Sequence, residues 1–192
     1  EMTKPVVGHT VMQYTEFVNN TVVKNNGHVA QASVLFAAAF AALSDVVVSD
    51  NNFYDNFGTA VHFSCAGSEL PANRSLCSVL WTRDMVFSNT AYGAPVLFVR
   101  PGSSVTSAIG LGMTMEHMLF RSNVALTAGN SGMDNMMSGA ITLATALSYG
   151  FFLNNCTFES NLADASSGSA LHLHLLEEIV LEISASSFTS DN

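Results

Sequence analysis

The chain has 192 residues and a net charge of −9 at pH 7, with 48% hydrophobic residues and only 11% charged ones. Average soluble domains carry roughly 25% charged residues, so a compact globule of this composition would struggle to cover its surface, whereas a stacked fold with Ser, Thr, Asn and Gly outside would not. The acidic balance argues against nucleic acid as a partner, and the longest apolar stretch, residues 32–43, is shorter than the roughly 18 residues of a membrane-spanning helix, so we expect no membrane insertion.

The predicted elements form one repeat along the chain. Each repeat carries a Phe-x-x-Asn landmark, and the landmark phenylalanines recur at spacings of 30 to 38 residues. In chain order the landmarks are Phe17 with Asn20, Phe53 with Asn56, a slipped Phe87 with Asn89, Phe120 with Asn123, Phe158 with Asn161, and finally Phe188 with Asp191. A repeat of this length is typical of solenoids and propellers.

Two strand-like runs flank each landmark. The run before it is short and apolar, as in residues 46–48 and 112–115, and the run after it starts with a small residue and then alternates, as in residues 58–63 and 138–143. Each unit is therefore predicted to contain a strand, a polar corner, a Phe-x-x-Asn turn, a loop and a second strand. The two-residue alternation favours strands over helices.

Stacked units of this kind form core columns, because two or three short strands cannot bury an apolar face alone. Equivalent residues of parallel units lie about 4.8 Å apart. One predicted column contains Met12, Val48, Trp81, Met115, Leu153 and Ile183, a second contains the landmark aromatics, and a third contains Val61, Val96, Ile141 and Leu171. The landmark asparagines are expected at a corner, where they tolerate left-handed backbone and bond the main chain of their neighbours.

The predicted fold is all-β: a right-handed single-stranded parallel β-helix, a solenoid of about five to six rungs over residues 1–192, with an inserted loop at 65–77. We expect it to be a segment of a longer β-helix, because its first and last rungs are open sheet edges without visible caps. A β-sandwich is the alternative, but it needs no repeated aromatic column. A propeller would need longer, four-stranded blades.

The landmark followed by a Gly-Gly-Ala-Ile-like strand resembles the repeats of polymorphic outer-membrane proteins and related pectate-lyase-like β-helix regions. The matching residues are Phe53 and Asn56 with 58–61, Phe120 and Asn123 with 138–141, and Phe158 and Asn161 with 169–171. The double glycine of that motif is replaced here by Ser138-Gly139 or Gly168-Ser169. The resemblance implies an extracellular or cell-surface location, and it carries over no catalytic residue.

Cysteines and sequons point to the same compartment. Cys65 and Cys77 stand at the two feet of the inserted loop, which predicts a disulfide and an oxidising environment; the alternative is two reduced thiols. Cys156 is expected to be a small buried residue. Sequons at Asn19, Asn73 and Asn155 are predicted glycosylation sites if the source is a secretory eukaryote, although an Asn-rich chain also produces sequons by chance.

The histidines are not predicted to bind metal. His62 and His172 align in one outward column, but Leu97 and Thr142 interrupt it, and zinc needs three or four converging ligands. We therefore expect neither a metal nor another cofactor.

One acidic group is the strongest catalytic candidate. Asp50, Asp55 and Asp84 fall near successive corners, with Arg83 beside them. Lyases and hydrolases built on β-helices use clustered carboxylates. A solvated acidic corner is the favoured interpretation, and no catalytic residue is assigned.

The expected function is that of an extracellular structural or adhesive β-helix module of a larger cell-surface or filament protein, acting as scaffold, spacer and assembly surface. The expected partners are flanking domains or copies of the same protein stacked end to end, with glycans as a further candidate. The alternative is a carbohydrate-binding or polysaccharide-cleaving domain, a lyase or hydrolase. A row of aromatic and acidic side chains along one outward face would favour that alternative.

Overall fold

The computed structural model describes residues 8–21, 33–39, 43–65, 75–92, 96–99, 109–126, 138–145, 150–163, 169–175 and 180–189. Every regular element within these ranges is a β-strand. Every strand pairing among them is parallel. The predicted all-β class and parallel pairing are therefore confirmed for the described part of the chain.

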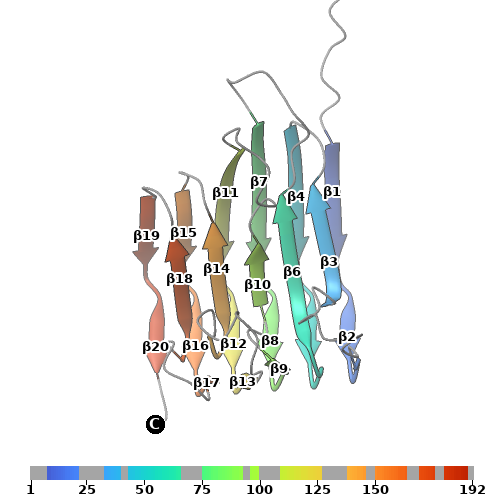
Figure 1. Ribbon diagram of the computed structural model, residues 1–192, viewed down its shortest axis with the longest axis vertical. Coiled ribbons are helices and arrows are strands. Elements are labelled where there is room, and N and C mark those ends of the chain that lie inside the picture. Colours follow the sequence, from blue (N-terminus) through green and yellow to red (C-terminus); the bar gives the residue numbers. More distant parts are fainter. Residues whose placement is uncertain are drawn as a thin grey trace, which may run out of the picture.

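The strands belong to four sheets (Figure 1). Sheet 1 contains, in order, β1 (Gly8–Gln13), β4 (Leu43–Ser49), β7 (Ser75–Thr82), β11 (Ile109–Glu116), β15 (Gly150–Asn154) and β19 (Val180–Ser184). Sheet 2 contains β2 (Glu16–Val18), β5 (Asn52–Tyr54), β8 (Met85–Phe87), β12 (Leu119–Arg121), β16 (Thr157–Glu159) and β20 (Ser187–Thr189). Sheet 3 is short, with β9 (Thr90–Tyr92), β13 (Val124–Leu126) and β17 (Leu162–Ala163). Sheet 4 contains β3 (Ser33–Ala39), β6 (Thr59–Cys65), β10 (Val96–Val99), β14 (Ile141–Thr145) and β18 (Leu171–Leu175).

The chain passes through these sheets in a fixed order. It follows a strand of sheet 1, then sheet 2, then sheet 3 where β9, β13 and β17 form, then sheet 4, and returns to the next strand of sheet 1. We call each passage a repeat unit; the first begins at β1 and the sixth at β19. Sheet 4 lies in front of sheet 1 in Figure 1, with its strands running the opposite way. Each strand pairs with its equivalents in neighbouring units, an arrangement compatible with a β-solenoid.

The predicted core columns are confirmed by the strand register. The partners along sheet 1 are Met12, Val48, Trp81, Met115, Leu153 and Ile183. The partners along sheet 4 are Val61, Val96, Ile141 and Leu171. Burial alternates along these strands, as in β15, since neighbouring residues point to opposite faces.

The landmark differs from the prediction in two respects. Its phenylalanines lie in the three-residue strands of sheet 2 and not in turns, with Phe17, Phe53, Phe120, Phe158 and Phe188 in one register column. In the third unit Val86 occupies this column, so the assignment of Phe87 as a landmark was wrong by one residue. Phe87 points to the opposite face of sheet 2.

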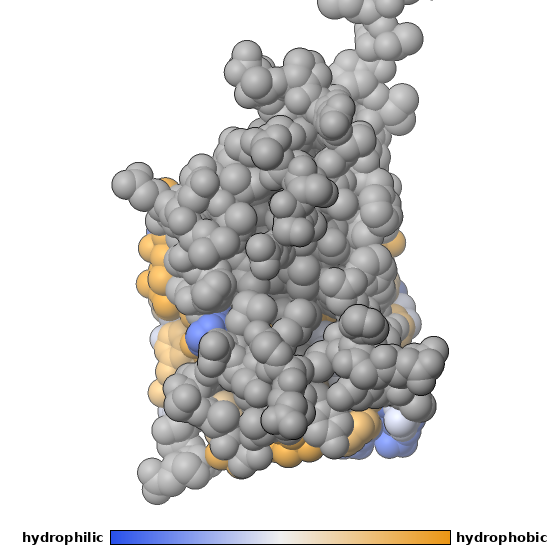
Figure 2. Space-filling model, viewed as in Figure 1, coloured by the Kyte–Doolittle hydropathy of each residue, from blue (hydrophilic) through white to orange (hydrophobic). Residues whose placement is uncertain are grey.

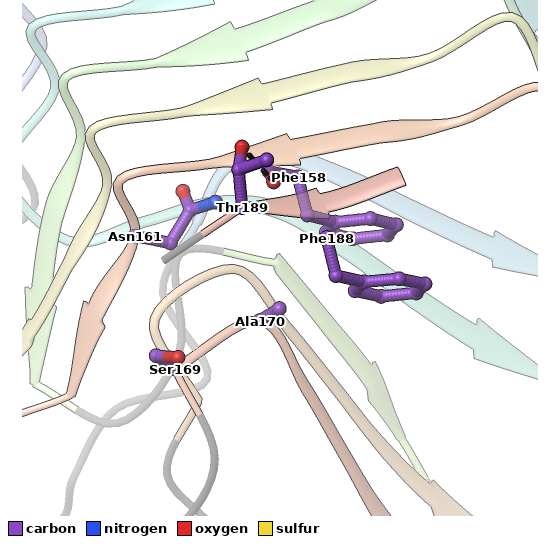
Figure 3. Close-up of a pocket in the computed structure, with 6 residues that line it drawn as sticks. All are labelled: Phe158, Asn161, Ser169, Ala170, Phe188 and Thr189. Carbon is purple, nitrogen blue, oxygen red and sulfur yellow. Dashed lines mark hydrogen bonds between the residues drawn. The ribbon is translucent and has the colours of Figure 1, made fainter. Parts of the chain in front are cut away.

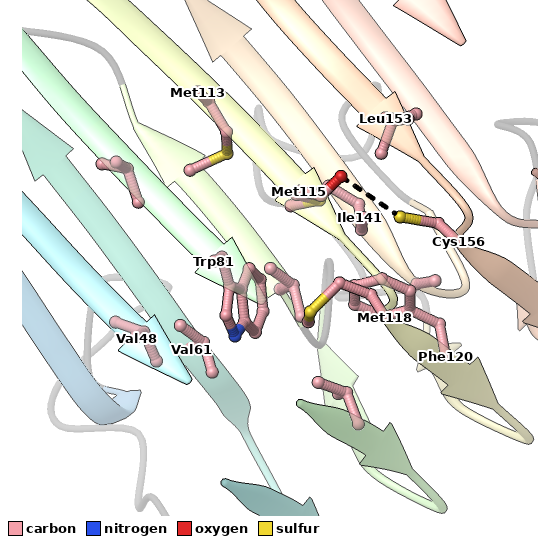
Figure 4. Close-up of a cluster of buried hydrophobic side chains, with 14 of the residues drawn as sticks. Val48, Val61, Trp81, Met113, Met115, Met118, Phe120, Ile141, Leu153 and Cys156 are labelled. Carbon is pink, nitrogen blue, oxygen red and sulfur yellow. Dashed lines mark hydrogen bonds between the residues drawn. The ribbon is translucent and has the colours of Figure 1, made fainter. Parts of the chain in front are cut away.

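The inward aromatic side chains form the centre of the core, where Figure 4 shows Trp81 and Phe120 among methionine and aliphatic side chains. Trp81, Phe53 and Phe120 are 0% exposed. On either side of Val86 the neighbouring rings of the column stack at 4.7–4.9 Å. Trp81 meets Phe120 edge-on at 5.7 Å. Full burial of one such side chain contributes roughly 1.5–3 kcal/mol, so this column is a major source of stability.

Two corners frame the sheet 2 strand of each unit. Residues with positive φ stand at the corner before it (Tyr14, Asp50, Arg83, His117, Asn155 and Ala185) and at the corner after it (Asn19, Asp55, Ser88, Ser122 and Ser160). This conformation costs a non-glycine residue roughly 1–2 kcal/mol, and backbone hydrogen bonds between units at the same corners offset the cost. The prediction that the landmark asparagine itself is left-handed is wrong, because that conformation falls on the residue before it.

Candidate functional site

The landmark asparagines form a continuous column at the second corner, which we call the asparagine ladder: Asn20, Asn56, Asn89, Asn123 and Asn161. The backbone N–H and the side-chain Nδ2 of each asparagine donate to Oδ1 of the next one, at 2.8–3.1 Å. Nδ2 also donates to a main-chain carbonyl of the preceding unit, as from Asn89 to Phe53 at 2.9 Å. The predicted bonding of these asparagines to neighbouring main chain is confirmed.

A second column lines the inside of the first corner, with Thr15, Asn51, Asp84, Met118, Cys156 and Ser186 as successive members. It is polar in the first three units. One Asp84 oxygen accepts the backbone N–H of Asn51 at 2.7 Å, and the other accepts Asn51 Nδ2 at 3.1 Å and Trp81 Nε1 at 2.5 Å. Asn51 in turn accepts the N–H of Thr15 at 2.9 Å. Asp84 therefore ties the core tryptophan to the corner.

Asp84 is a titratable group held inside the protein, at 0% exposed. Burial raises its pKa from 3.8 to about 6, while the hydrogen bonds from Asn51 and Trp81 act in the opposite direction. Because the pKa is higher in the folded chain than in the unfolded one, the folded protein binds this proton more tightly. The resulting stability is complete below about pH 4 and is lost as the pH rises through about 6.

This shift leads to a testable pH dependence. The free energy of unfolding of the native protein, minus that of Asp84→Asn, is expected to fall by up to about 3 kcal/mol between pH 4 and pH 7. Urea denaturation of both proteins across this range measures the difference, and the shared contributions of other groups cancel. A difference that rises with pH would mean that the hydrogen bonds to the carboxylate outweigh its burial.

The acidic residues proposed for catalysis do not converge. Arg83 holds Asp50 through two hydrogen bonds of 2.7 Å, and this contact lowers the pKa of the Asp50 carboxyl. Asp84 lies inward beneath the same corner, whereas Asp55 is exposed at the other corner. Arg83, Asp50 and Asp84 are thus engaged in contacts between repeat units.

A row of outward-facing side chains on sheet 2 was not predicted from the sequence. Tyr54 and Phe87 stack at 4.9 Å with an interplanar angle of 2°, and the Arg121 guanidinium lies 5.8 Å from the Phe87 ring centre. Val18 and Glu159 continue the row at its two ends. With Val86 placed in the aromatic column, the residues that follow Phe53, Val86 and Phe120 are Tyr54, Phe87 and Arg121. Aligning these three positions would have predicted the row.

The three cysteines fall in different places. Cys156 is buried, its Sγ lies 3.6 Å from the Met115 carbonyl, and burial raises the pKa of its thiol; its predicted role as a small buried residue is confirmed. Cys65 ends β6 in sheet 4 and Cys77 lies in β7 of sheet 1. The side chains of this pair lie outside the described residues, so their disulfide stays a prediction.

The disulfide can be tested by alkylation and intact-mass measurement. We expect one modified thiol in the denatured, unreduced chain and three after reduction, because only Cys156 is then free beforehand. Loss of the bridge is expected to cost on the order of 3 kcal/mol of stability, from the entropy of the unfolded loop. Three modified thiols before reduction would exclude the disulfide.

Two of the three predicted glycosylation sites lie within the described residues. Asn19 and Asn155 are exposed at positive-φ corners. Asn155 Nδ2 lies 2.6 Å from His117 Nδ1. Asn73 lies outside the described residues. Glycosylation at all three remains a prediction.

The histidine column is interrupted as expected. His62, Leu97, Thr142 and His172 are register partners along sheet 4. Thr142 is 0% exposed, so this outward position is covered. Across the ranges that the structure describes, no three His, Cys, Asp or Glu side chains are grouped to hold a metal ion.

A groove of ≈ 250 Å³ opens at the sixth unit (Figure 3). Stacked rings of Phe158 and Phe188 form one wall, and Ser169 and Ala170, in the bend just before β18, form the other. Asn161 and Thr189 complete the lining. No sequence pattern predicts this groove, because its walls come from different strands and corners of the fifth and sixth units and meet only in the folded chain.

Comparisons with known proteins identify no relative: no protein-family model, no curated protein and no solved structure matches the chain significantly. Among the described residues, no helix has the length and hydrophobicity required to cross a membrane.

Proposed function

We propose that the chain is an extracellular structural or adhesive module of a larger cell-surface or filament protein, built as a right-handed single-stranded parallel β-helix of about six rungs. The asparagine ladder carries this proposal. It joins four repeat units through buried hydrogen bonds and a fifth, at Asn20, through partly buried ones. The polar side chains at this corner therefore hold neighbouring units together.

Further features support the architecture. Sheets 1, 2 and 4 contribute to one hydrophobic core, as the walls of a β-helix do. Connections between parallel strands of one sheet are right-handed in nearly all proteins, which supports the proposed hand. The likeness to pectate-lyase-like and polymorphic outer-membrane repeats, and continuation into a longer β-helix with flanking domains or stacked copies, belong to the same proposal.

The outward row of Tyr54, Phe87 and Arg121 is the described feature closest to a carbohydrate platform. Sugars stack their C–H groups on the electron-rich faces of aromatic rings. Tyr54 covers one face of Phe87 and Arg121 lies over the ring, while Val18 neighbours Tyr54 on its other side. The row therefore presents ring edges, which favours the structural function over carbohydrate binding.

The proposal is tested by glycan-array binding and by cleavage assays on acidic polysaccharides, using the purified chain. We expect neither saturable binding nor turnover. Turnover would overturn the proposal, as would binding that is lost in Tyr54→Ala and Phe87→Ala but kept in Tyr14→Ala, a control at an 80% exposed aromatic residue.

Hydrogen exchange tests the architecture separately. The backbone amides of Asn56, Asn89 and Asn123 donate to buried acceptors, so we expect them to exchange among the slowest of the chain. Fast exchange of all three would contradict a stacked ladder.

A further inference from the structure

The outer face of sheet 2 combines apolar and charged side chains from the second to the fifth repeat unit. Each three-residue strand there places its first and third residues outward, because the middle residue belongs to the core column. The first outward column contains Asn52, Met85, Leu119 and Thr157, and the second contains Tyr54, Phe87, Arg121 and Glu159. This face therefore involves neither the first nor the last unit.

The composition of this face is typical of a protein interface, where methionine, aromatic residues and arginine are enriched and lysine is depleted. Met85, Phe87 and Arg121 lie in the third and fourth units, and neither column contains a lysine. Met85 is 40% exposed. The Phe87 ring is already held between Tyr54 and Arg121, so less conformational entropy is lost when it enters an interface.

Sheet 3 also exposes apolar side chains, and hydrophobic surface gathers along the lower edge of Figure 2, near its strands. Phe57 is 38% exposed and Leu162 46%. Thr90 and Val124 stand between them in one column, which carries no charge that would select a partner. The columns of sheet 2 do carry charges, and the order of their side chains defines the partner.

We propose that the outer face of sheet 2 binds the same face of a second copy, with the two stacks running in opposite directions. The pairing rests on the stacked-unit architecture of the proposed function and assigns an assembly surface to it. Such a contact is isologous, because a two-fold axis makes each residue pair occur twice. With this axis along the strands and between the third and fourth units, the third unit faces the fourth unit of the other copy, and the second faces the fifth.

Each outward column is then matched with itself in reverse order. The facing pairs are Met85 with Leu119, Phe87 with Arg121, Tyr54 with Glu159, and Asn52 with Thr157. The first two bury apolar surface, since the stem of an arginine side chain is apolar. The last two join hydrogen-bond donors to acceptors. No carboxylate of these columns faces another carboxylate.

The corners on either side of sheet 2 favour the same orientation. In the proposed pairing, Asp50 faces Asn155 of the second copy and Asp55 faces Ser160, as the order of the corner residues requires. With both stacks running in the same direction, the corner before each strand would meet the corner after it, and Asp50 would face Asp55. Juxtaposed like charges oppose association, so the reversed orientation is the favoured one.

Sedimentation equilibrium of the purified chain tests the pairing. Strands of three residues make a narrow face, and small interfaces are weak, so we expect a dimer with a Kd on the order of 100 μM. Met85→Lys and Leu119→Glu are each expected to raise this Kd at least about ten-fold, because each places a charge against an apolar side chain. Val11→Lys is the matched control, at a 50% exposed residue of sheet 1, and is expected to leave the Kd unchanged.

Mixing the two variants tests which residues face each other. An equimolar mixture of Met85→Lys and Leu119→Glu is expected to dimerise again, because the introduced lysine faces the introduced glutamate and the symmetry-related pair stays native. Stacks running in the same direction would set Met85 against Phe87, and a mixture of Met85→Lys with Phe87→Glu would then restore the dimer instead. That result would overturn the inference, as would a chain that stays monomeric well above the expected Kd or a dimer that both single variants leave intact.

Hydrogen exchange at Asn89 and Asn123, measured on the native chain and on each variant, separates the two proposals. Slow exchange in a monomeric native chain means that only the pairing fails. Fast exchange in the native chain means that the stacked architecture fails as well. If Leu119→Glu alone exchanges fast, the mixture of Phe87→Lys with Arg121→Glu replaces it, since these residues also face each other in the proposed dimer, and failure of that mixture to dimerise would overturn the pairing.

Discussion

Asn89→Ala is expected to lower the free energy of unfolding by about 3–5 kcal/mol, because it leaves several buried groups without partners and each such group costs about 1–3 kcal/mol. Asn89 accepts the N–H of Asn56 at 3.1 Å and donates to the Phe53 carbonyl at 2.9 Å. Both partners are buried, at 2% and 0% exposed. Chemical denaturation measures the loss.

Asn20→Ala is the control for this prediction. Asn20 is exposed at the first unit and its side chain donates to its ladder neighbour Asn56, so removal of the side chain is expected to cost less than about 1 kcal/mol. Similar losses in both variants would mean that the ladder contributes through the backbone alone. The asparagine side chains would then be dispensable.

Phe120→Ala is expected to destabilise the protein by about 3–5 kcal/mol, the usual cost of deleting a buried phenylalanine side chain. Phe120 is 0% exposed, stacks on Phe158 at 4.9 Å and contacts Trp81 edge-on. The cavity would open at the centre of the core, between sheets 1 and 2. Thermal or urea unfolding, monitored by the fluorescence of the single tryptophan, measures the effect.

Phe188→Ala provides the comparison within the same column. Phe188 is 46% exposed and stacks on Phe158, so its loss is expected to cost about 1 kcal/mol. Equal destabilisation by the two substitutions would contradict the placement of Phe120 inside the core.

The columns of sheets 1 and 4 were predictable because alternation fixes which residues point inward and the repeat fixes which ones stack. Met12 through Ile183 are in register as predicted. The third unit was misaligned because Phe87 is the more conspicuous residue beside Val86. Phenylalanine and valine are both apolar, so either residue could occupy the inward position. Only the register of β8 shows that Val86 does.

The corner chemistry was less accessible from sequence. Asp84 follows Arg83, whose positive φ turns the chain and directs the next residue inward. Nothing in the local sequence separates that arrangement from a solvated acidic corner. The contact with Trp81 Nε1 and the pKa of about 6 follow from burial, which depends on the packing of three units at once.

The asparagine ladder constrains how a chain of this kind can change its length. Within the described part of the chain, the units of Asn56, Asn89 and Asn123 each offer the same acceptor to the unit before and the same donors to the unit after. Removing or duplicating one whole period, such as residues 57–89, would join matching ends and preserve the contacts of the ladder. Insertions of other sizes are compatible only in the segments between sheets. Length can therefore vary in steps of one strand spacing, about 4.8 Å, without redesign of the interior.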